Sequence, residues 1–557
     1  MNKKHRDLEL SSAAFGVMES NYHNKWIELE RLYASKYTKE FIEQAKELER
    51  SHLFIPIGKS TVDILDAIFT EAFFGAGNPV EIIKNEDDES DIASCLNVLA
   101  DHYYKKAKPY IALGMAFSSA SRFGVGAVLP YWDTNRKLPI TRFVPATKIA
   151  FDTDALTRDE IQYVSYKFKQ TKQDIAKKVK DKFYDKISKN DLRKILGSNH
   201  DEEKEKYQRV NVTEVYSLNT DGTHTCRTFI KSTLVREVKM KYCPIKHGYL
   251  VPVLPTIDEA LQDLQSAGIG ESVLDVIRDL ISELNQKRNQ IVDINEQLID
   301  PFTMVGDEAD IAPEDAGRIK GVVNVGNPDK VKRFPPTTSF PIEKEVSLLL
   351  EDLNDLTAIN GMQRGQTSAS DRRAASAMAM INANSSARLS KMATTINDTL
   401  FNDWAEAFVR DIYVNAPDDL IVELFGWNPL GNQGERLEMD YVVNVNFGQS
   451  INRDAKISEL TMLMQMLNGR EDADIMPILK EVLKLILGDG YDEESIFGGV
   501  LGGSGSIEGV AGEQANGVAG AGEQGVDGAA AGGFVNTIAG AGNINGVEHN
   551  GAAQNKI

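Results

Sequence analysis

The feature that most constrains this chain is a fixed order of segments between residues 268 and 413: a helix, an insert, a helix, a loop and a long helix. Apolar residues in 271–300 recur at helical spacings, which predicts an amphipathic helix of about thirty residues, roughly 45 Å long. Pro301 ends that helix. The insert that follows, 302–340, contains four more prolines and a VVNV run that predicts a strand.

Behind the insert, the chain returns to helices. Pro341 at a first helical position favours a short helix up to residue 357. The loop 358–371 is polar and contains two glycines, and Asp371 is a suitable N-cap for the long helix that follows. The first half of that helix is rich in Ala, Ser, Asn and Met, which allow close helix packing. The layout is that of a mechanical part rather than of a reactive site.

The residues before this run mix helices and strands, judged from the spacing of their apolar residues. The predicted helices cover 10–50, the stretch from Pro56 to Phe74, 92–107 and 110–122. The predicted strands cover 123–132, 136–169, 211–230 and 233–242. Asp221 and Gly222 form the predicted hairpin turn. A charged helical stretch, 172–205, is expected to be a solvated surface lobe.

Beyond the long helix, the runs 419–427 and 441–448 predict strands, and helical spacing returns up to residue 496. Gly and Ala dominate residues 497–557, and this composition cannot bury a core, which predicts a disordered tail. With 557 residues, the chain exceeds what one hydrophobic core usually organises. The predicted fold class is therefore α+β, mainly helical, with several domains or one elongated subunit.

Composition excludes several classes of protein. The net charge of −20 argues against a protein that wraps nucleic acid tightly, because such binding needs Lys and Arg to neutralise phosphates. Cys95, Cys226 and Cys243 are far apart and odd in number, which favours a reducing compartment. The N-terminus lacks the pattern of a secretory signal. The most apolar stretch, 62–80, carries three acidic residues and predicts a buried helix rather than a membrane span.

Motifs that would indicate chemistry are incomplete. Gly58–Thr61 resembles the end of a phosphate-binding loop, but Leu53 stands where that motif needs its first glycine. Gly268 and Gly270 lack the rest of a dinucleotide fingerprint and are expected to free the backbone ahead of the helix. The histidines never pair at metal-binding spacing, and the carboxylates in 307–310 are expected to form a solvated loop. The sequence predicts no catalytic site, no metal and no cofactor.

The order of elements across residues 10–490 resembles that of bacteriophage portal proteins, the head–tail connectors, of the short-tailed podovirus type. The most specific segments are FGVGAVLPYW (123–132), GIGESVLDVIRDLISELNQKRNQI (268–291) and GMQRGQTSASDRRAASAMAM (361–380). The resemblance implies a non-enzymatic, ring-shaped channel of twelve subunits at one capsid vertex. Viral double-stranded DNA would be packaged and later ejected through it. The Gly-rich tail has no counterpart in the family pattern.

The resemblance also divides the chain into parts. It implies an α+β wing, a first stem helix, a clip, a second stem helix, a tunnel loop, a long wing helix with strands, and crown helices ahead of the tail. The corresponding ranges are 1–265, 266–301, 302–340, 341–357, 358–371, 372–450, 451–496 and 497–557.

The tunnel loop and the start of the helix behind it would face the DNA. A loop past which DNA slides must be flexible and mostly uncharged, and its glycines and amides fit that need. The residues assigned to it are Gly361, Met362, Gln363, Arg364, Gly365, Gln366, Thr367, Arg372 and Arg373. The three arginines contact DNA phosphates in one interpretation. In the other, Arg372 and Arg373 form a helix-start salt bridge with Asp371 or a neighbour.

Two further sets of basic residues are candidates for binding. Lys287 and Arg288 on the first stem helix either contact phosphates or pack against the adjacent subunit. Lys330, Lys332 and Arg333 in the clip form a basic strip that either meets an acidic partner or is solvated.

The implied partners are other copies of the chain, viral DNA, the terminase large subunit, a tail adaptor, and the major capsid and scaffolding proteins, with no membrane. The implied location is the portal vertex of the virion, and the host cytoplasm during assembly. A second hypothesis is a non-enzymatic scaffolding or interaction protein of the virion that forms no DNA channel. A third, a nucleotide-dependent enzyme using Gly58–Thr61, would need ATP binding.

Overall fold

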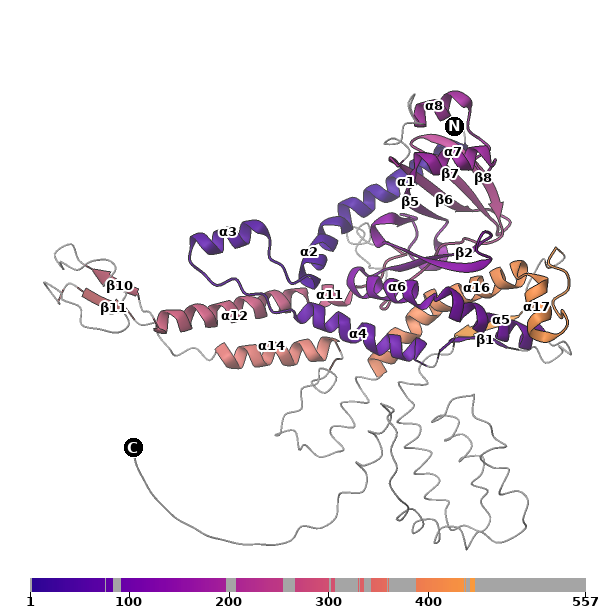
Figure 1. Cartoon of the computed structure of the whole chain (residues 1–557). Helices are drawn as coiled ribbons and strands as arrows, with labels where there is room; N and C mark the ends of the chain where they lie inside the picture. Colours follow the sequence, from indigo (N-terminus) through magenta and orange to yellow (C-terminus); the bar gives the residue numbers. More distant parts are fainter. Residues whose placement is uncertain are drawn as a thin grey trace, which may run out of the picture. The chain divides into compact units, whose positions relative to one another are not determined.

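The computed structural model (Figure 1) describes most of the chain ahead of residue 446. The described residues are 3–75, 77–83, 92–196, 207–253, 266–299, 302–305, 329, 331–334, 342–357, 359, 387–434, 436 and 441–445. The chain divides into two units, 1–488 and 489–557, and every described residue belongs to the first. Four predicted parts lie outside the described residues: the VVNV strand of the insert 302–340, most of the tunnel loop, the crown helices and the Gly-rich tail.

The described residues mix helix and sheet, as the α+β prediction requires. The helices of the N-terminal part are α1 (Lys3–Met18), the π-helical turn η1 (Glu19–His23), α2 (Asn24–Tyr33), α3 (Lys39–Glu47), α4 (Ile57–Phe74), α5 (Ile92–Ala107), α6 (Tyr110–Phe123), α7 (Lys172–Lys180) and α8 (Lys189–Leu196). The later ones are α11 (Val273–Val276), α12 (Arg278–Ile299), α14 (Ile342–Thr357), the π-helical turn η5 (Asn397–Phe401), α16 (Asn402–Asn415) and α17 (Asp418–Phe425).

The strands among the described residues form four antiparallel sheets. The largest has the order β4-β5-β6-β7-β8, a second has the order β3-β2-β9, β1 pairs with β12, and β10 pairs with β11. Their bounds are β1 Val80–Ile83, β2 Gly126–Asp133, β3 Leu138–Val144, β4 Ile149–Phe151, β5 Tyr163–Thr171, β6 Arg209–Leu218, β7 His224–Ile230, β8 Thr233–Met240, β9 Lys246–Gly248, β10 Phe302–Val305, β11 Val331–Phe334 and β12 Val442–Val445. The predicted hairpin at Gly222 is confirmed, with φ +77° at that glycine.

The five-stranded sheet carries helices on both faces because its strands alternate their side chains between the two. On one face, α1 crosses the sheet, and its Asp7 forms an ion pair with Arg227 of β7. On the other face, α7 and α8 cover Phe168, Val212 and Ile230. On the face that α7 and α8 cover, the part of the sheet beside β3 is left uncovered by these two helices.

The largest hydrophobic core lies among α4, α5, α6 and the helical stretch 387–415. Trp404 of α16 is fully buried at its centre and donates a hydrogen bond from Nε1 to Thr141 Oγ1, 2.9 Å away. The Phe401 ring packs against the Phe73 ring of α4 at a tilt of 35°, with ring centroids 4.4 Å apart. The pairing of β1 with β12 brings Val80 opposite Val445, which fastens the C-terminal end of the described chain to this core.

Glycines fix the place where α6 meets the segment before α11. Gly124 ends α6 with φ +79°, and its carbonyl accepts a hydrogen bond from the Gly270 N–H at 2.8 Å. A Cβ on Gly124 would lie 2.1 Å from the Gly270 oxygen, and one on Gly268 would lie 2.4 Å from the Phe151 ring. The glycines at 268 and 270 therefore serve close packing, not only the backbone freedom predicted for them.

Two predictions of secondary structure in this part of the fold need correction, and one strand was missed. Residues 10–50 do not form one helix, because Ser35 adopts φ +55° and Thr38 then caps α3 by accepting from Phe41 N–H. The run 419–427 is a helix rather than a strand. Pro417 and two aspartates start α17, and Gly426 in the left-handed region ends it. The strand β1 escaped prediction because it is four residues long.

Candidate functional site

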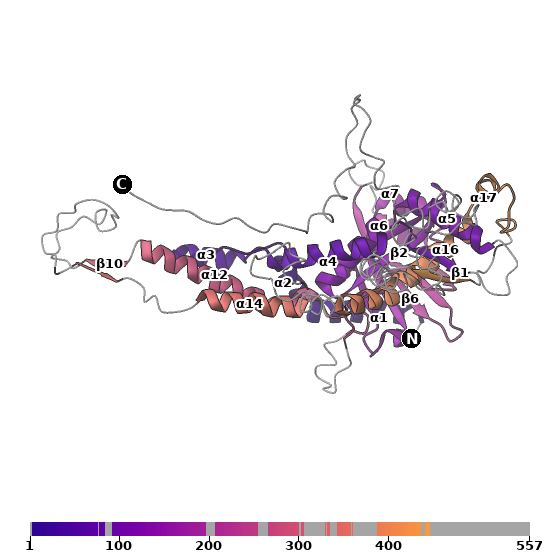
Figure 2. The ribbon, with the colours of Figure 1, turned by 90° about the horizontal axis from the view of Figure 1, so that it is seen from below.

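The part of the chain predicted to form the stem contains α11, α12 and α14, and the predicted clip between them contains the hairpin β10–β11 (Figures 1 and 2). The sequence predicts one helix from 271 to 300, and the structure breaks it at Ile277, whose φ of −102° ends α11. Ser272 explains the separate start: its hydroxyl accepts from Asp275 N–H and donates to the Arg122 carbonyl at 2.6 Å. The short helix α11 is thus anchored to the end of α6, and α12 continues for 22 residues.

Three polar side chains of α12 hold an extended segment of the chain, residues 51–55, along the helix. The Ile55 N–H donates to Asn285 Oδ1 at 2.7 Å, and the Leu53 N–H donates to Asn289 Oδ1 at 2.8 Å. The Ser51 N–H donates to Asp293 Oδ1, also at 2.8 Å. Four helical residues advance about 6 Å, and two extended residues advance about 6.6 Å, so each helical turn meets every second N–H.

Asn285 and Asn289 are buried, and their side-chain NH2 groups also donate hydrogen bonds. Asn285 is 2% exposed and Asn289 is 7% exposed. The Asn289 Nδ2 donates to the Leu53 carbonyl at 3.0 Å and to the Tyr37 hydroxyl at 3.1 Å. A buried amide whose donors and acceptor are satisfied keeps one geometry. The segment is therefore fixed by specific hydrogen bonds rather than by apolar packing alone.

The helix α14 runs back beside α12 (Figures 1 and 2). Leu353 of α14 is buried in the same hydrophobic cluster as Ile281 of α12. Glu345 of α14 forms an ion pair with Lys287 of α12, with 2.7 Å between Lys287 Nζ and Glu345 Oε2. This hydrogen bond to Glu345 raises the pKa of Lys287. Lys287, predicted to touch phosphates or a neighbouring subunit, thus has an intrachain partner. Arg288 is exposed and forms no ion pair within the described residues.

The outer side of α14 carries a stripe of exposed residues at the spacing of one helical face. Its apolar members are Leu348, 51% exposed, and Leu356, 48% exposed. Glu351, Asp352 and Asp355 are exposed on the same face. Lys344 is exposed on the same face, which therefore has a net charge of 1 − 3 = −2. An exposed face that combines large apolar residues with mainly acidic charge is typical of a surface that meets another molecule.

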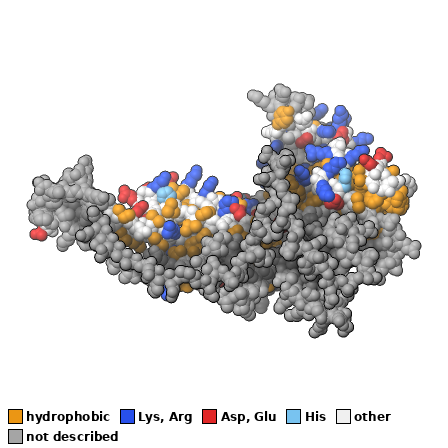
Figure 3. Space-filling model, turned by 60° about the horizontal axis from the view of Figure 1, so that its bottom comes forward, with side chains coloured by type: hydrophobic (Ala, Val, Ile, Leu, Met, Phe, Trp, Pro, Cys, Tyr) orange, Lys and Arg blue, Asp and Glu red, His pale blue; other side chains and the backbone are white. Residues whose placement is uncertain are grey.

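A groove of about 900 Å³ lies on another side of α12, between that helix and α2–α3. Its wall includes the exposed side chains of Ile27, Phe41 and Leu48, and its cations are Arg31, Lys36 and Arg50. Figure 3 shows hydrophobic side chains among Lys and Arg side chains on this part of the molecule. The acidic residues of the groove are already engaged: Glu28 pairs with Arg278, and Asp293 holds Ser51.

The hairpin β10–β11 occupies the insert between the stem helices. Phe302 pairs with Phe334 and Val305 with Val331, in antiparallel register. Lys332 and Arg333 lie on β11, opposite Met304 and Thr303. Lys330 and the carboxylates at 307, 308 and 310 lie outside the described residues.

The candidate DNA-facing residues are also outside the described part of the chain. They are Gly361, Met362, Gln363, Arg364, Gly365, Gln366, Thr367, Arg372 and Arg373. The structure therefore describes α14 before the predicted tunnel loop and the helical stretch 387–415 after it, but only Ile359 of the loop itself.

The phosphate-loop candidate Gly58–Thr61 is used for packing. It forms the first turn of α4, and a Cβ on Gly58 would lie 3.2 Å from the Ile281 side chain. Lys59 Nζ pairs with Asp63 at 2.7 Å. Within the described ranges no group of His, Cys, Asp or Glu has the arrangement of a metal site, and no helix has the length and apolarity to span a membrane.

Comparisons with known proteins find weak structural likenesses without a matching family. No family model matches the chain, and no curated protein matches it. A chain from the virion of a native gene transfer agent particle is similar over 83% of this chain and 93% of its own length. The sequence identity is 10% and the TM-score is 0.34, and at that TM-score the likeness carries no argument.

Proposed function

We propose that copies of this chain assemble, side by side through their stems, into a closed portal-type ring that conducts viral double-stranded DNA. The order α12, β10–β11, α14 and then the helical stretch 387–415 supports this proposal, because the portal resemblance implies that order. In this function the chain performs no chemistry. The terminase supplies the energy of packaging, and the clip hairpin meets first the terminase and later a tail adaptor.

The observation that carries the proposal is that the stem has two unlike but complementary faces. The groove on α12 combines apolar side chains with Arg31, Lys36 and Arg50. The outer face of α14 combines Leu348 and Leu356 with three carboxylates. An acidic, apolar helix face of one copy fits a basic, apolar groove of the next by charge and by burial.

The positions of these two faces favour a ring. On α12, Lys287 points to α14, and it lies about 130° around the helix from the middle of the groove-lining residues, at 100° per residue. A contact between two different patches is heterologous, so each copy can bind one neighbour on each side. Such contacts close into a ring when the rotation per copy divides a full turn. The count of twelve rests on the family resemblance.

Charge reversal tests the contact between copies. Replacing Arg31 and Arg50 by Glu should abolish assembly, and so should replacing Asp352 and Asp355 by Lys. Combining all four changes in one chain should restore it, because the charges are again complementary. Sedimentation velocity reports assembly, and Glu423→Lys on the exposed side of α17 is the matched control. Unchanged assembly in both charge-reversed variants would contradict the proposed interface.

The DNA-conducting role has its own test in the tunnel loop. Replacing Gly361 and Gly365 by Pro should block packaging of DNA into capsids while rings still form, because proline fixes the backbone of a loop that the proposal requires to move past DNA. Packaging that continues at the normal level would refute the loop assignment. Assembly into open filaments without a ring would favour the scaffolding hypothesis instead.

A further inference from the structure

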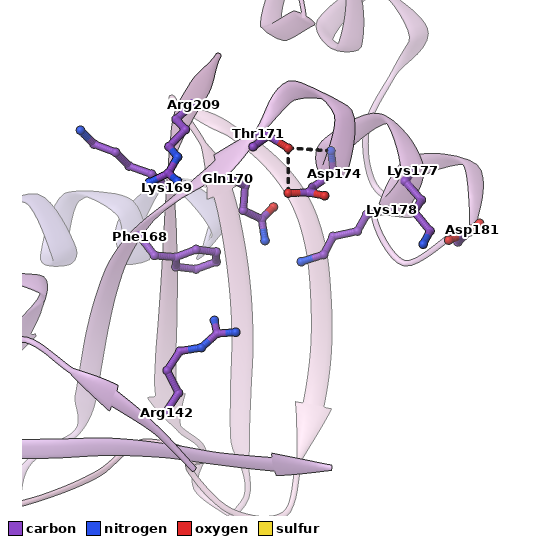
Figure 4. Close-up of a pocket in the computed structure, with 10 residues that line it drawn as sticks. All are labelled: Arg142, Phe168, Lys169, Gln170, Thr171, Asp174, Lys177, Lys178, Asp181 and Arg209. Carbon is purple, nitrogen blue, oxygen red and sulfur yellow. Dashed lines mark hydrogen bonds between the residues drawn. The ribbon is translucent and has the colours of Figure 1, made fainter. Parts of the chain in front are cut away.

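A cleft of about 510 Å³ opens between β5 and α7, on the part of the five-stranded sheet that α7 and α8 leave uncovered (Figure 4). Its walls come from β3, β5, the start of β6, and α7. The residues that line it are Arg142, Phe168, Lys169, Gln170, Thr171, Asp174, Lys177, Lys178, Asp181 and Arg209.

A tight turn creates this cleft. Thr171 ends β5 and caps α7 directly: its hydroxyl accepts from Asp174 N–H at 3.1 Å and donates to Asp174 Oδ2 at 2.7 Å. The chain therefore passes from strand to helix without a loop. In Figure 4, Arg142 from β3, Gln170 from β5 and Lys178 from α7 point toward one space beside the Phe168 ring.

The charge of the cleft is opposite to that of the whole chain. Five of its lining residues are Lys or Arg and two are Asp, which gives 5 − 2 = +3 in a chain of net charge −20. One of the two carboxylates, Asp174, already accepts the hydroxyl proton of Thr171. A concave surface of one sign attracts and concentrates ions of the opposite sign.

The two converging cations are held by aromatic rings and not by carboxylates. The Arg142 guanidinium lies 5.3 Å from the Tyr131 ring and donates to the Tyr131 hydroxyl at 3.1 Å. Lys178 Nζ lies 5.1 Å from the Phe183 ring and 5.3 Å from the Tyr184 ring. Among the described residues neither cation has an ion-pair partner, whereas Arg227 on the opposite face has two.

Burial is the main influence on the charge of Lys178. Burial lowers the pKa of Lys178, and Glu214 opposes this shift more strongly than Arg236 adds to it, while Asp174 and Arg142 have smaller opposing effects. Both oxygens of Glu214 are already hydrogen-bonded, one to Tyr216 and the other to Thr228. An anion seated between Arg142 and Lys178 would stabilise both charges.

We propose that this cleft binds a phosphate group, held by Arg142 and Lys178 with Gln170 as a neutral donor. Guanidinium and ammonium groups form charge-assisted hydrogen bonds to phosphate, and three donors from three directions suit a tetrahedral anion better than a flat carboxylate. Cation–π contacts hold the side chains of Arg142 and Lys178 in place before a phosphate binds, which limits the conformational entropy lost on binding. The phosphate is either free in solution or part of a nucleic acid. This site is independent of the contact between stems.

Calorimetric titration of the full chain with pyrophosphate, with a short DNA duplex and with polyglutamate tests the proposal. Pyrophosphate should bind, and Arg142→Gln or Lys178→Met should weaken binding roughly tenfold or more, because each removes a charge-assisted contact. Lys106→Met, an equal change of charge on an exposed face of α5, should leave it unchanged. Binding should survive in the variant whose stem charges are reversed.

The outcomes separate the sources of phosphate. Binding of pyrophosphate alone identifies a free phosphate, and binding of the duplex with the same dependence on Arg142 and Lys178 identifies nucleic acid. Wild-type protein that binds no pyrophosphate at millimolar concentration overturns the proposal, whatever the variants do. Polyglutamate that binds more tightly than pyrophosphate at this cleft overturns it as well, in favour of an acidic peptide. Lys178→Arg, which keeps the charge, should retain binding if the fold is intact.

Discussion

The helical core around Trp404 and the stem formed by α12 and α14 are stabilised in different ways. In the core, Trp404, Phe401 and Phe69 are at most 1% exposed and pack against one another's helices. In the stem, buried asparagines hold the segment 51–55 by hydrogen bonds, while leucines such as Leu348 stay half exposed. The core is complete within one chain. The stem keeps apolar surface that another molecule would cover, which is why we assign assembly to it.

The largest effect should come from the core. Trp404→Ala removes a fully buried indole and should lower the free energy of unfolding by about 3–5 kcal/mol, measured by urea denaturation. Trp427→Ala is the matched control, because Trp427 is 54% exposed and its loss should cost little. Equal losses of unfolding free energy in the two variants would show that the buried Trp404 stabilises the protein no more than the exposed Trp427.

The glycine contact that joins α6 to the segment before α11 should come next. Gly124→Ala places a side chain at φ +79° and against the Gly270 carbonyl, so we expect a loss of about 1–3 kcal/mol. Gly114→Ala, within the same helix, has no neighbouring atom within 4 Å of the new Cβ and should stabilise the protein by about 0.5–1 kcal/mol. If both substitutions changed the free energy of unfolding in the same direction, the contact between Gly124 and the Gly270 carbonyl would not be what requires a glycine at position 124.

Loss of a hydrogen bond that holds the segment 51–55 to α12 should lower the free energy of unfolding by as much as Gly124→Ala or less, and its effect should be local. Asn289→Ala leaves the Leu53 N–H and carbonyl without their partner and should cost about 1–3 kcal/mol. Amide hydrogen exchange should rise at residues 51–55 and not around Trp404. Gln290→Ala, on the exposed side of the same turn, is the control. Exchange that rises equally across the chain would mean that the segment is not a separate unit.

The smallest effect should come from the ion pair between the stem helices. Lys287→Met should leave the urea midpoint nearly unchanged, because both Lys287 and Glu345 remain accessible to water. The small difference from wild type should vanish at high salt, where exposed ion pairs are screened. A large, salt-independent loss would show that this pair, and not the apolar seam at Leu353, holds α14 in place.

The sequence predicted those elements whose signals are local. Pro56 and Gly75 bound α4 closely, and the Asp-Gly turn located the β6–β7 hairpin. The prediction of a strand at 419–427 was wrong because a short apolar run has no clear period, and the helix signals at Pro417 and Gly426 outweigh it. The break at Ile277 depends on Ser272 reaching the end of α6, a contact between residues 150 apart in the chain.

The candidate surfaces were less predictable from the sequence. Asn285, Asn289 and Asp293 recur every four residues, which was a readable signal, but their partners in 51–55 lie more than 200 residues away. The cleft between β5 and α7 needs Arg142 from another sheet beside Lys178 from a helix. Such sites form only when the fold brings distant elements together, and single-sequence patterns do not encode that approach.

Electron-microscopic class averages of the purified chain, viewed down any symmetry axis, test the central claim most directly. We expect closed rings of about twelve copies, the number that the portal resemblance implies, with a central hole wide enough for a DNA duplex. The variant with Asp352 and Asp355 replaced by Lys should appear as separate subunits under the same conditions. Monomers or solid particles from the wild-type chain would contradict the account.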